Sequence, residues 1–270
     1  MIDTKQFLCD WRGRSGLLRS LTRHLDDLHK RNAIGAGPDE RMHGGLAPFQ
    51  TLTLPLSTST QLAVTHNRAR KDIALAAATP LRPPLRHSAS TFGAPHPGVH
   101  ASSPHLFSAS LRLGILSSDF GDHPVGHALL PWVRSLMRRR GLDVVCIASD
   151  SPERAHSGSE LRRAIADACT AFYDVTALSD AEAARVVDEQ QLHLLINMVG
   201  HTAGARHVVT QWRPAPVQAM HYGYAATTAL PAIGYMQLDR ISAPPMLHRD
   251  YTEKLAYFPH CHFVAVHATR

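Results

Sequence analysis

From residue 111 to residue 222 the chain alternates short, continuous apolar runs with longer segments in which apolar residues recur every three or four positions. Continuous apolar runs are typical of strands buried on both faces of a sheet, and the wider spacing is typical of amphipathic helices. The pattern predicts strands within 111–119, 142–148, 171–175, 192–198 and 217–222. It predicts the intervening helices at 124–140, 159–168, 179–190 and 203–212.

Single helices between successive strands indicate parallel pairing with right-handed crossovers. The predicted fold class is therefore α/β, a Rossmann-like parallel sheet with helices on both faces. In such sheets ligands bind beyond the carboxyl ends of the strands. Polar residues follow two of these strand ends, at 117–127 and 197–202, so the pattern places the candidate chemistry there.

The first 107 residues are organised differently. Within 6–31, leucines spaced by three and four predict a pair of amphipathic helices. Residues 32–106 are rich in Pro, Gly, Ser and His, which predicts a partly disordered linker interrupted by a short helix near 63–78. The predicted organisation is a helical segment and linker over 1–107 and a Rossmann-like domain over 108–270.

The net charge of +6 lies mainly outside the predicted domain. Residues 1–107 hold thirteen Lys and Arg against seven Asp and Glu, while residues 108–270 hold fifteen of each. A nucleic-acid-binding domain needs a basic stripe on its folded surface, so no nucleic-acid partner is expected.

The cysteines do not indicate a disulfide framework or a structural zinc site, because no two are in CxxC spacing. Neighbouring residues of a strand point to opposite faces, so one metal could hardly bind all of His260, Cys261 and His262, and no metal site is predicted. No apolar stretch is long enough for a membrane span, and the amino terminus lacks the apolar core of a signal peptide. A reducing, intracellular compartment is the expectation.

Three histidines are candidates for proton transfer. His123 and His127 lie four residues apart at a predicted helix start and so face the same side. A neutral imidazole can accept a proton from a hydroxyl at physiological pH, and His201 follows a strand end in the same manner. The same spacing also fits a helix cap and a packed polar residue, so the residues alone leave both interpretations open.

Neutral hydrogen-bonding groups near the same strand ends suit a sugar or a peptide: Asn197, Thr202 and the turn 222–228. Each is also an ordinary turn residue. Tyr251 and Lys254 could reach a phosphate, although a solvated lysine beside Glu253 fits equally well. No Walker A motif, GxSxG elbow, HExxH motif or paired-glycine dinucleotide fingerprint is present.

Four ordered segments make the sequence recognisable: Leu111–His127, Asn197–Arg206, Arg213–Met220 and Glu253–His260. They resemble the catalytic region of O-GlcNAc transferases and their SPINDLY-type relatives, glycosyltransferase family 41. Cys9–Trp11 and Leu52–Leu56 resemble the segment that joins the tetratricopeptide repeats to that region, so the similarity spans nearly the whole chain.

The resemblance implies the amino-terminal lobe of a two-lobed GT-B enzyme. Such an enzyme moves GlcNAc from UDP-GlcNAc to Ser or Thr of cytoplasmic and nuclear proteins, with inversion and without a cofactor or metal. The carboxyl-terminal nucleotide-binding lobe and the repeats are expected in a full-length member, and the chain by itself is expected to bind UDP-GlcNAc weakly or not at all. By the same resemblance His127 is the first choice for the base, with His123 beside it and His201 as the alternative. Substrate contacts are carried over to Asn197, Thr202, Tyr224, Thr227, Thr228 and Lys254.

Two departures from the family pattern bear on substrate contacts: Val199 stands where Asn is common, and the turn from Tyr224 lacks the usual Pro-Gly. The donor stays open between UDP-GlcNAc and the GDP-fucose of SPINDLY-type protein O-fucosyltransferases, because donor choice lies largely in the second lobe. A different class is also open: a non-catalytic remnant that serves as an interaction module.

Overall fold

The computed structural model describes residues 13–33, 47–87, 110–150 and 158–263. The chain divides into two compact units, Met1–Lys71 and Asp72–Arg270. From the sequence we predicted a boundary between residues 107 and 108, whereas the boundary in the structure falls within a helix, between Lys71 and Asp72. Residues 72–87, assigned to the linker from composition, thus belong to the same unit as the sheet.

The first unit contains α2 (Arg14–Ala33), α3 (Pro48–Thr51) and most of α4 (Thr58–Ala78). Among the described residues a single helix replaces the expected helix pair of 6–31, and residues 6–12 lie outside the described part. Part of the leucine stripe packs as its spacing predicts: Leu25 is buried with Leu54 and Leu56, and the partly buried Leu18 and Leu21 pack against them.

The segment 47–87 is not the loose linker that its composition indicates. The helix expected near 63–78 begins five residues earlier, at Thr58, and runs for 21 residues. The hydroxyl of Ser57 accepts a hydrogen bond from the Thr60 backbone at 3.2 Å and satisfies a donor at the helix start. The rest of the expected linker, 34–46 and 88–109, lies outside the described residues.

The second unit is built on a seven-stranded parallel sheet in the order β3-β2-β1-β4-β5-β6-β7. All five predicted strands are present: β1 (Leu111–Ser117), β2 (Leu142–Ala148), β3 (Ala171–Asp174), β4 (Leu194–Asn197) and β5 (Val217–His221). The sequence missed β6 (Tyr235–Leu238) and β7 (Lys254–Tyr257). Both are four residues long and incompletely buried, so neither shows a continuous apolar run.

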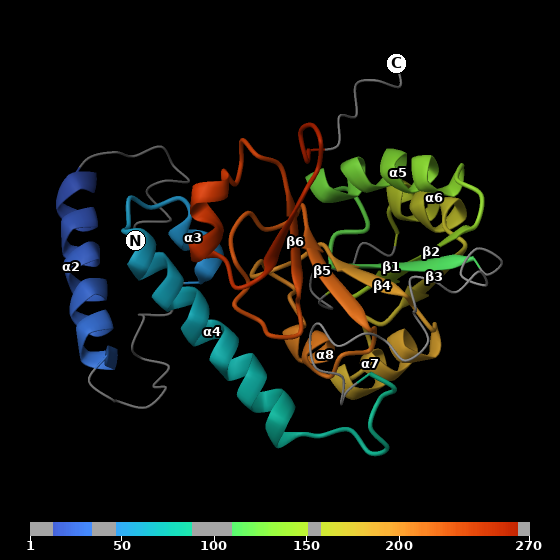
Figure 1. The fold of residues 1–270 in the computed structure, drawn as a ribbon, viewed down its shortest axis with the longest axis horizontal. Helices are drawn as coiled ribbons and strands as arrows, with labels where there is room; N and C mark the ends of the chain where they lie inside the picture. Colours follow the sequence, from blue (N-terminus) through green and yellow to red (C-terminus); the bar gives the residue numbers. More distant parts are fainter. Residues whose placement is uncertain (1–12, 34–46, 88–109, 151–157, 264–270) are drawn as a thin grey trace. The chain divides into compact units, whose positions relative to one another are not determined.

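Helices cover both faces of this sheet (Figure 1): α5 (Pro124–Met137) and α6 (Glu160–Ala168) lie on one face, α7 (Asp180–Glu189) and α8 (His207–Gln211) on the other. A short 3-10 helix, η4 (Pro245–Asp250), joins β6 to β7. α8 begins four residues later than predicted, because Gly200 and Gly204 adopt positive φ angles and form an open turn ahead of it.

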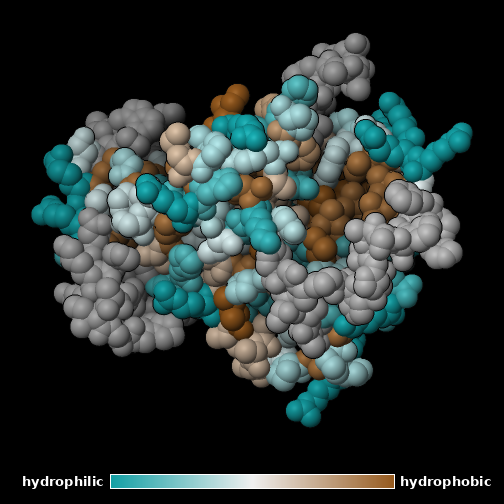
Figure 2. Space-filling view, in the orientation of Figure 1, coloured by the Kyte–Doolittle hydropathy of each residue, from teal (hydrophilic) through white to brown (hydrophobic). Residues whose placement is uncertain are grey.

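The core has two halves because successive strand residues point to opposite faces. Ile115 packs in the cluster beneath α5 and α6, while Leu116 packs in the cluster beneath α7. Figure 2 shows hydrophobic side chains gathered between α5 and the sheet. This double-sided burial is the reason that the central strands are largely apolar.

A disulfide joins Cys146 of β2 to Cys169, 23 residues later, at the end of α6. The scattered cysteines had indicated no such bond, so that expectation was wrong for this pair. The β2–α6–β3 crossover returns the chain to the start of β2, where the Thr170 backbone donates to the Val144 carbonyl at 2.8 Å. The crossover therefore brings together two cysteines whose spacing carries no signal.

Candidate functional site

The strand order changes direction between β1 and β4. From β1 the chain continues to β2 and β3 on one side, and it then returns to β4 on the other side of β1. Such a switch point leaves a crevice at the carboxyl ends of the two strands. The Ser118 hydroxyl donates to the Ala203 carbonyl at 3.3 Å across this point, so the two polar segments predicted from the sequence do meet.

His123 caps α5. Its Nδ1 accepts a hydrogen bond from the Val125 backbone at 3.2 Å, and a carboxylate oxygen of the buried Asp119 lies 3.8 Å from the same nitrogen. Accepting at Nδ1 fixes the neutral tautomer with the proton on Nε2. In this arrangement the outer nitrogen of His123 is a hydrogen-bond donor, and the cap interpretation left open by the sequence applies to this residue.

His127 lies one turn further along α5 and is exposed. Its Nε2 is 2.9 Å from Oδ1 of Asp122, with side chains 58% and 86% exposed. If Nε2–H donates to the carboxylate, Nδ1 carries the lone pair and can accept a proton. Of the three candidate histidines, His127 has the most exposed side chain, and in this tautomer its Nδ1 is basic.

The close approach of α5 to the end of β1 depends on Gly126. A Cβ atom at this position would collide with the carbonyl oxygen of Gly121 and lie 2.9 Å from that of Asp119. Both neighbours are backbone atoms, which cannot rotate away. Glycine therefore allows the loop from Asp119 to His123 to fold over the first turn of the helix.

His201 lies inside the protein, 5% exposed. Its Nε2 is 2.7 Å from the Thr228 carbonyl oxygen, which can only accept, so Nε2 carries the proton. Its Nδ1 is 3.1 Å from Nε2 of His207. Both ring nitrogens are thus engaged, and the structure does not present His201 to an incoming hydroxyl group.

Asn197 and Gly200 shape the turn after β4. The Asn197 amide oxygen accepts hydrogen bonds from the backbones of Val199 at 2.8 Å and Gly200 at 3.1 Å. Gly200 has a φ of +55°, and a Cβ there would lie 2.7 Å from Cγ of the buried Tyr224. The Thr202 hydroxyl donates back to the Val199 carbonyl at 2.8 Å. These predicted substrate contacts act within the turn in this structure.

Thr227 and Thr228 are also buried, and their hydroxyls donate to the carboxylate of Glu253, the Thr227 bond being 2.7 Å long. The family resemblance implied that both threonines line the sugar side, whereas the structure turns them toward this carboxylate. Glu253 was missed because it lies 25 and 26 residues further along the chain.

Lys254 is exposed at the first position of β7, where it pairs with Tyr235 at the start of β6. All strands are parallel, so this lysine lies at the amino-terminal edge of the sheet and not with the polar groups at the switch point. Close by, burial raises the pKa of Tyr251 to about 12, with a further rise from the carboxylates of Glu253 and Asp250. Tyr251 therefore keeps its hydroxyl proton at neutral pH.

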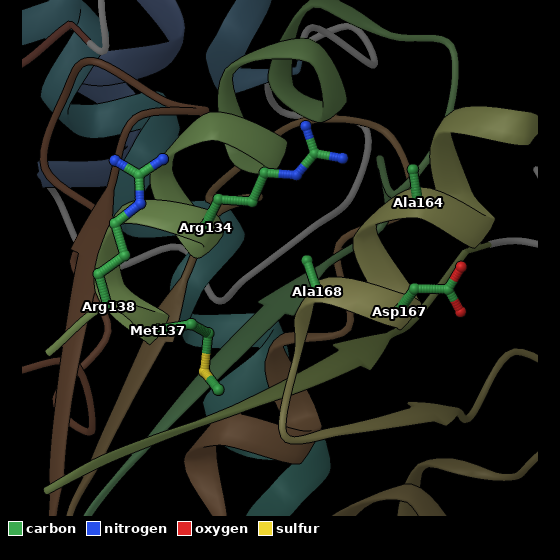
Figure 3. Close-up of a pocket in the computed structure, with 6 residues that line it drawn as sticks. All are labelled: Arg134, Met137, Arg138, Ala164, Asp167 and Ala168. Atoms are coloured by element: carbon green, nitrogen blue, oxygen red, sulfur yellow. The ribbon is translucent and has the colours of Figure 1, made fainter. Parts of the chain in front are cut away.

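The described surface of the second unit includes the following two hollows. One, of about 370 Å³, lies beyond the carboxyl ends of β2 and β3 and includes Ser149, Asp180 and Arg206. The other lies between α5 and α6 and is lined by Arg134, Met137, Arg138, Ala164, Asp167 and Ala168 (Figure 3). Helices in these crossovers run antiparallel to the strands, so the second hollow is near the amino-terminal edge of the sheet.

In the described part of the chain, no helix has the length and apolar character needed to cross a membrane.

The fold and the switch-point segments define a Rossmann-like lobe of a GT-B glycosyltransferase. Residues 90–270 match Glycosyl transferase family 41, and the chain belongs to that family.

Two curated relatives resemble nearly the whole chain. It is 28% identical over 264 residues to the probable UDP-N-acetylglucosamine–peptide N-acetylglucosaminyltransferase SEC of Arabidopsis thaliana, with 98% of this chain and 25% of that protein covered. The identity to the UDP-N-acetylglucosamine–peptide N-acetylglucosaminyltransferase of Caenorhabditis elegans is also 28%, over 97% of this chain and 21% of the relative. The chain thus spans about a quarter of the length of these relatives.

A solved structure agrees with the sequence matches. A variant of the O-GlcNAc transferase of Thermobaculum terrenum superposes with a TM-score of 0.65 at 25% identity, covering 90% of this chain and 42% of that one. The resemblance drawn from four sequence segments therefore extends to the tertiary fold.

Proposed function

We propose that this chain forms the amino-terminal lobe of a protein O-GlcNAc transferase. The enzyme would transfer GlcNAc from UDP-GlcNAc to Ser or Thr hydroxyls of cytoplasmic and nuclear proteins. The observation that carries the proposal is the exposed His127–Asp122 pair at the switch point of a family 41 lobe. The names of the two long relatives support the donor and the peptide acceptor.

His127 is the proposed general base. The acceptor hydroxyl attacks the anomeric carbon, its proton moves to Nδ1 of His127, and the bond from that carbon to the diphosphate oxygen breaks with inversion. Asp122 holds the ring through Nε2 and stabilises the imidazolium that forms. Rate enhancement beyond proton transfer comes from positioning the sugar and from fixed donors around the leaving diphosphate.

The other predicted residues have supporting roles in this proposal. His123 caps α5 and, by accepting at Nδ1, keeps its proton on Nε2. Asn197 and Thr202 set the turn that faces the same crevice, while Thr227 and Thr228 hold the loop behind it. A second lobe would supply most contacts to the sugar nucleotide. The chain covers 42% of the bacterial enzyme, which agrees with this proposal. The proposed transfer step uses no metal.

GDP-fucose is the second candidate donor. The segment Gly200–Thr202 favours the SPINDLY-type pattern, and the chain is 33% identical over 88 residues to a probable UDP-N-acetylglucosamine–peptide N-acetylglucosaminyltransferase named SPINDLY from Arabidopsis thaliana. That match covers 33% of this chain, and this relative too is named a UDP-N-acetylglucosamine transferase, so the names of the relatives support GlcNAc.

The test is sugar transfer to protein from radiolabelled UDP-GlcNAc and GDP-fucose, by the chain alone and by a longer enzyme that contains it. Incorporation from UDP-GlcNAc by the longer enzyme, with little by the chain alone, is the expected result. His127→Ala should lower kcat by about 10²–10⁴-fold. Asp122→Asn should lower it less, because the ring remains.

His24→Ala is the control, since His24 is an exposed histidine of α2. Full activity of His127→Ala would place the base elsewhere. Incorporation only from GDP-fucose would mean that GDP-fucose, and not UDP-GlcNAc, is the donor. No incorporation from either donor by the longer enzyme would favour a non-catalytic interaction module.

A further inference from the structure

Three buried side chains with metal-binding atoms converge behind the turn that follows β4. They are Asp72 of α4, His201 of the turn and His207 at the start of α8, with exposures of 8%, 5% and 2%. One carboxylate oxygen and one nitrogen from each ring all lie within 4.8 Å of one another. Two imidazole nitrogens and a carboxylate oxygen form a ligand set suited to zinc and related divalent cations.

The two imidazoles already have the spacing of metal ligands. Nδ1 of His201 and Nε2 of His207 face each other at 3.1 Å, and the ring planes meet at 68°. Two nitrogens bound to one tetrahedral zinc ion at ~2.05 Å each lie about 3.3 Å apart. Occupation of the site would therefore need loss of the proton between the two nitrogens, a turn of both rings toward a common ion and an approach of the Asp72 carboxylate.

The orientation of His201 is fixed from its far side. Its Nε2–H donates to the Thr228 carbonyl at 2.7 Å, which directs the Nδ1 lone pair at His207. Histidines that bind metals usually donate their second ring nitrogen to a carbonyl or carboxylate in this manner, and that bond raises the basicity of the ligand nitrogen.

The segments that carry the three ligand residues are held in place by other contacts. The Trp212 indole donates to the Ala76 carbonyl at 3.1 Å, one helical turn beyond Asp72, so this end of α4 is fixed to the end of α8. Just ahead of His207, the Arg206 guanidinium binds Asp180 at 2.7 Å and the Val175 carbonyl at 2.8 Å. The three ligands are thus supported by contacts that do not depend on a metal.

From these observations we propose that Asp72, His201 and His207 bind a divalent cation of the zinc class. The centre would be structural, because it is buried and links the last turns of α4 to the β4–α8 turn. It is separate from the exposed His127–Asp122 pair proposed for transfer, so either proposal can fail without the other.

The test uses the full chain without a histidine tag, stripped of metal by a chelator and dialysed. Titration calorimetry with ZnCl₂ should give about one ion per chain, and CoCl₂ should produce the visible absorption of a tetrahedral nitrogen- and oxygen-bound ion. Affinity should fall as the pH is lowered through the histidine range, because protons compete for the nitrogens.

Asp72→Asn and His207→Gln should each weaken zinc binding by about 100-fold or more and remove the zinc-dependent rise in melting temperature. The control is His262→Asn, which alters a buried histidine 2.6 Å from Asp239 and outside the cluster, and it should bind zinc as the unaltered chain does. Circular dichroism establishes that each variant is folded.

Two results would overturn the proposal. The first is a folded, unaltered chain that shows no saturable binding of zinc or cobalt up to ~1 mM, an affinity too weak for a structural site. The second is equal binding by the unaltered chain and by the Asp72 and His207 variants. Either result would mean that the imidazoles form only a hydrogen-bonded pair.

Discussion

The backbone nitrogen of Thr228 lies 2.7 Å from Oε1 of Glu253. The same carboxylate accepts hydrogen bonds from the hydroxyls of Thr227 and Thr228, and Glu253 is only 5% exposed. This contact closes the long β5–β6 connection against the start of β7. It also places the Thr228 carbonyl where the ring of His201 can bind it.

Glu253→Gln should reduce the free energy of unfolding by about 2–4 kcal/mol. The substitution replaces one carboxylate oxygen, an acceptor, with an NH₂ group that would face the N–H and O–H donors of the threonines. Hydrogen bonds to charged groups contribute about 1.5–3 kcal/mol each. Urea unfolding followed by circular dichroism measures the change. Glu160→Gln is the control, because that side chain is 96% exposed. Equal stability of the two variants would contradict the role given to Glu253.

His221 should make the protein less stable in mild acid. Burial, and to a smaller extent the neighbouring His262, lowers the pKa of His221 from 6.5 to about 4. The unfolded chain therefore takes up a proton near pH 6.5, whereas the folded chain does so only near pH 4. Stability is complete above pH 6.5 and is lost as the pH falls toward 4, by about 3 kcal/mol.

Urea unfolding of the unaltered chain and of His221→Gln at several pH values between 4 and 7 isolates this contribution. The stability advantage of the unaltered chain should shrink by about 3 kcal/mol across that range, since glutamine does not titrate. Parallel curves for the two proteins would show that His221 does not keep its low pKa.

Gly126→Ala should destabilise the second unit by about 1–3 kcal/mol, because the added methyl group meets two backbone carbonyls. The direction of this stability change is informative, because replacing glycine by alanine within a helix ordinarily stabilises a protein by about 0.5–1 kcal/mol. Gly158→Ala is the matched control, with no atom within 4 Å of the added carbon. Thermal unfolding of both variants checks this, and a gain in stability for Gly126→Ala would refute the close approach.

Reduction of the Cys146–Cys169 disulfide should lower the free energy of unfolding by about 3 kcal/mol, the chain-entropy value for a loop of this size. Peptide mapping without reductant should recover the two cysteines as one linked species, while the exposed Cys261 reacts with iodoacetamide. Cys169→Ala should reproduce the effect of reduction, and Cys261→Ala should not. Iodoacetamide labelling of Cys146 in the native protein would contradict the bond.

Local sequence signals predicted the elements well where the relevant residues are close along the chain. The helix predicted from residue 179 is an example: Ser179 and Glu182 form a capping box at the start of α7, with hydrogen bonds of 2.8 Å and 3.3 Å between the backbone of one and the side chain of the other. The five apolar strands were predicted correctly for the same reason. Short, partly exposed β6 and β7 gave no such signal, and composition alone misjudged 47–87.

The candidate site was predicted only in part. Two polar segments at neighbouring strand ends followed from parallel topology, and the family followed from four motifs. Which histidine is exposed did not follow, because His123, His127 and His201 occupy similar sequence contexts. The structure separates them by their partners: a backbone amide for His123, an exposed carboxylate for His127, and a carbonyl with a second imidazole for His201.

The sequence by itself thus determined the alternation of strands and helices, the parallel sheet and the membership of family 41, because these depend on periodicity and on contiguous motifs. Only the tertiary structure decided that Thr227 and Thr228 bind Glu253, that Cys146 reaches Cys169 and that Asp72 approaches His201 and His207. Those partners are separated by 23 or more residues along the chain, and the packing of helices on the sheet brings them together.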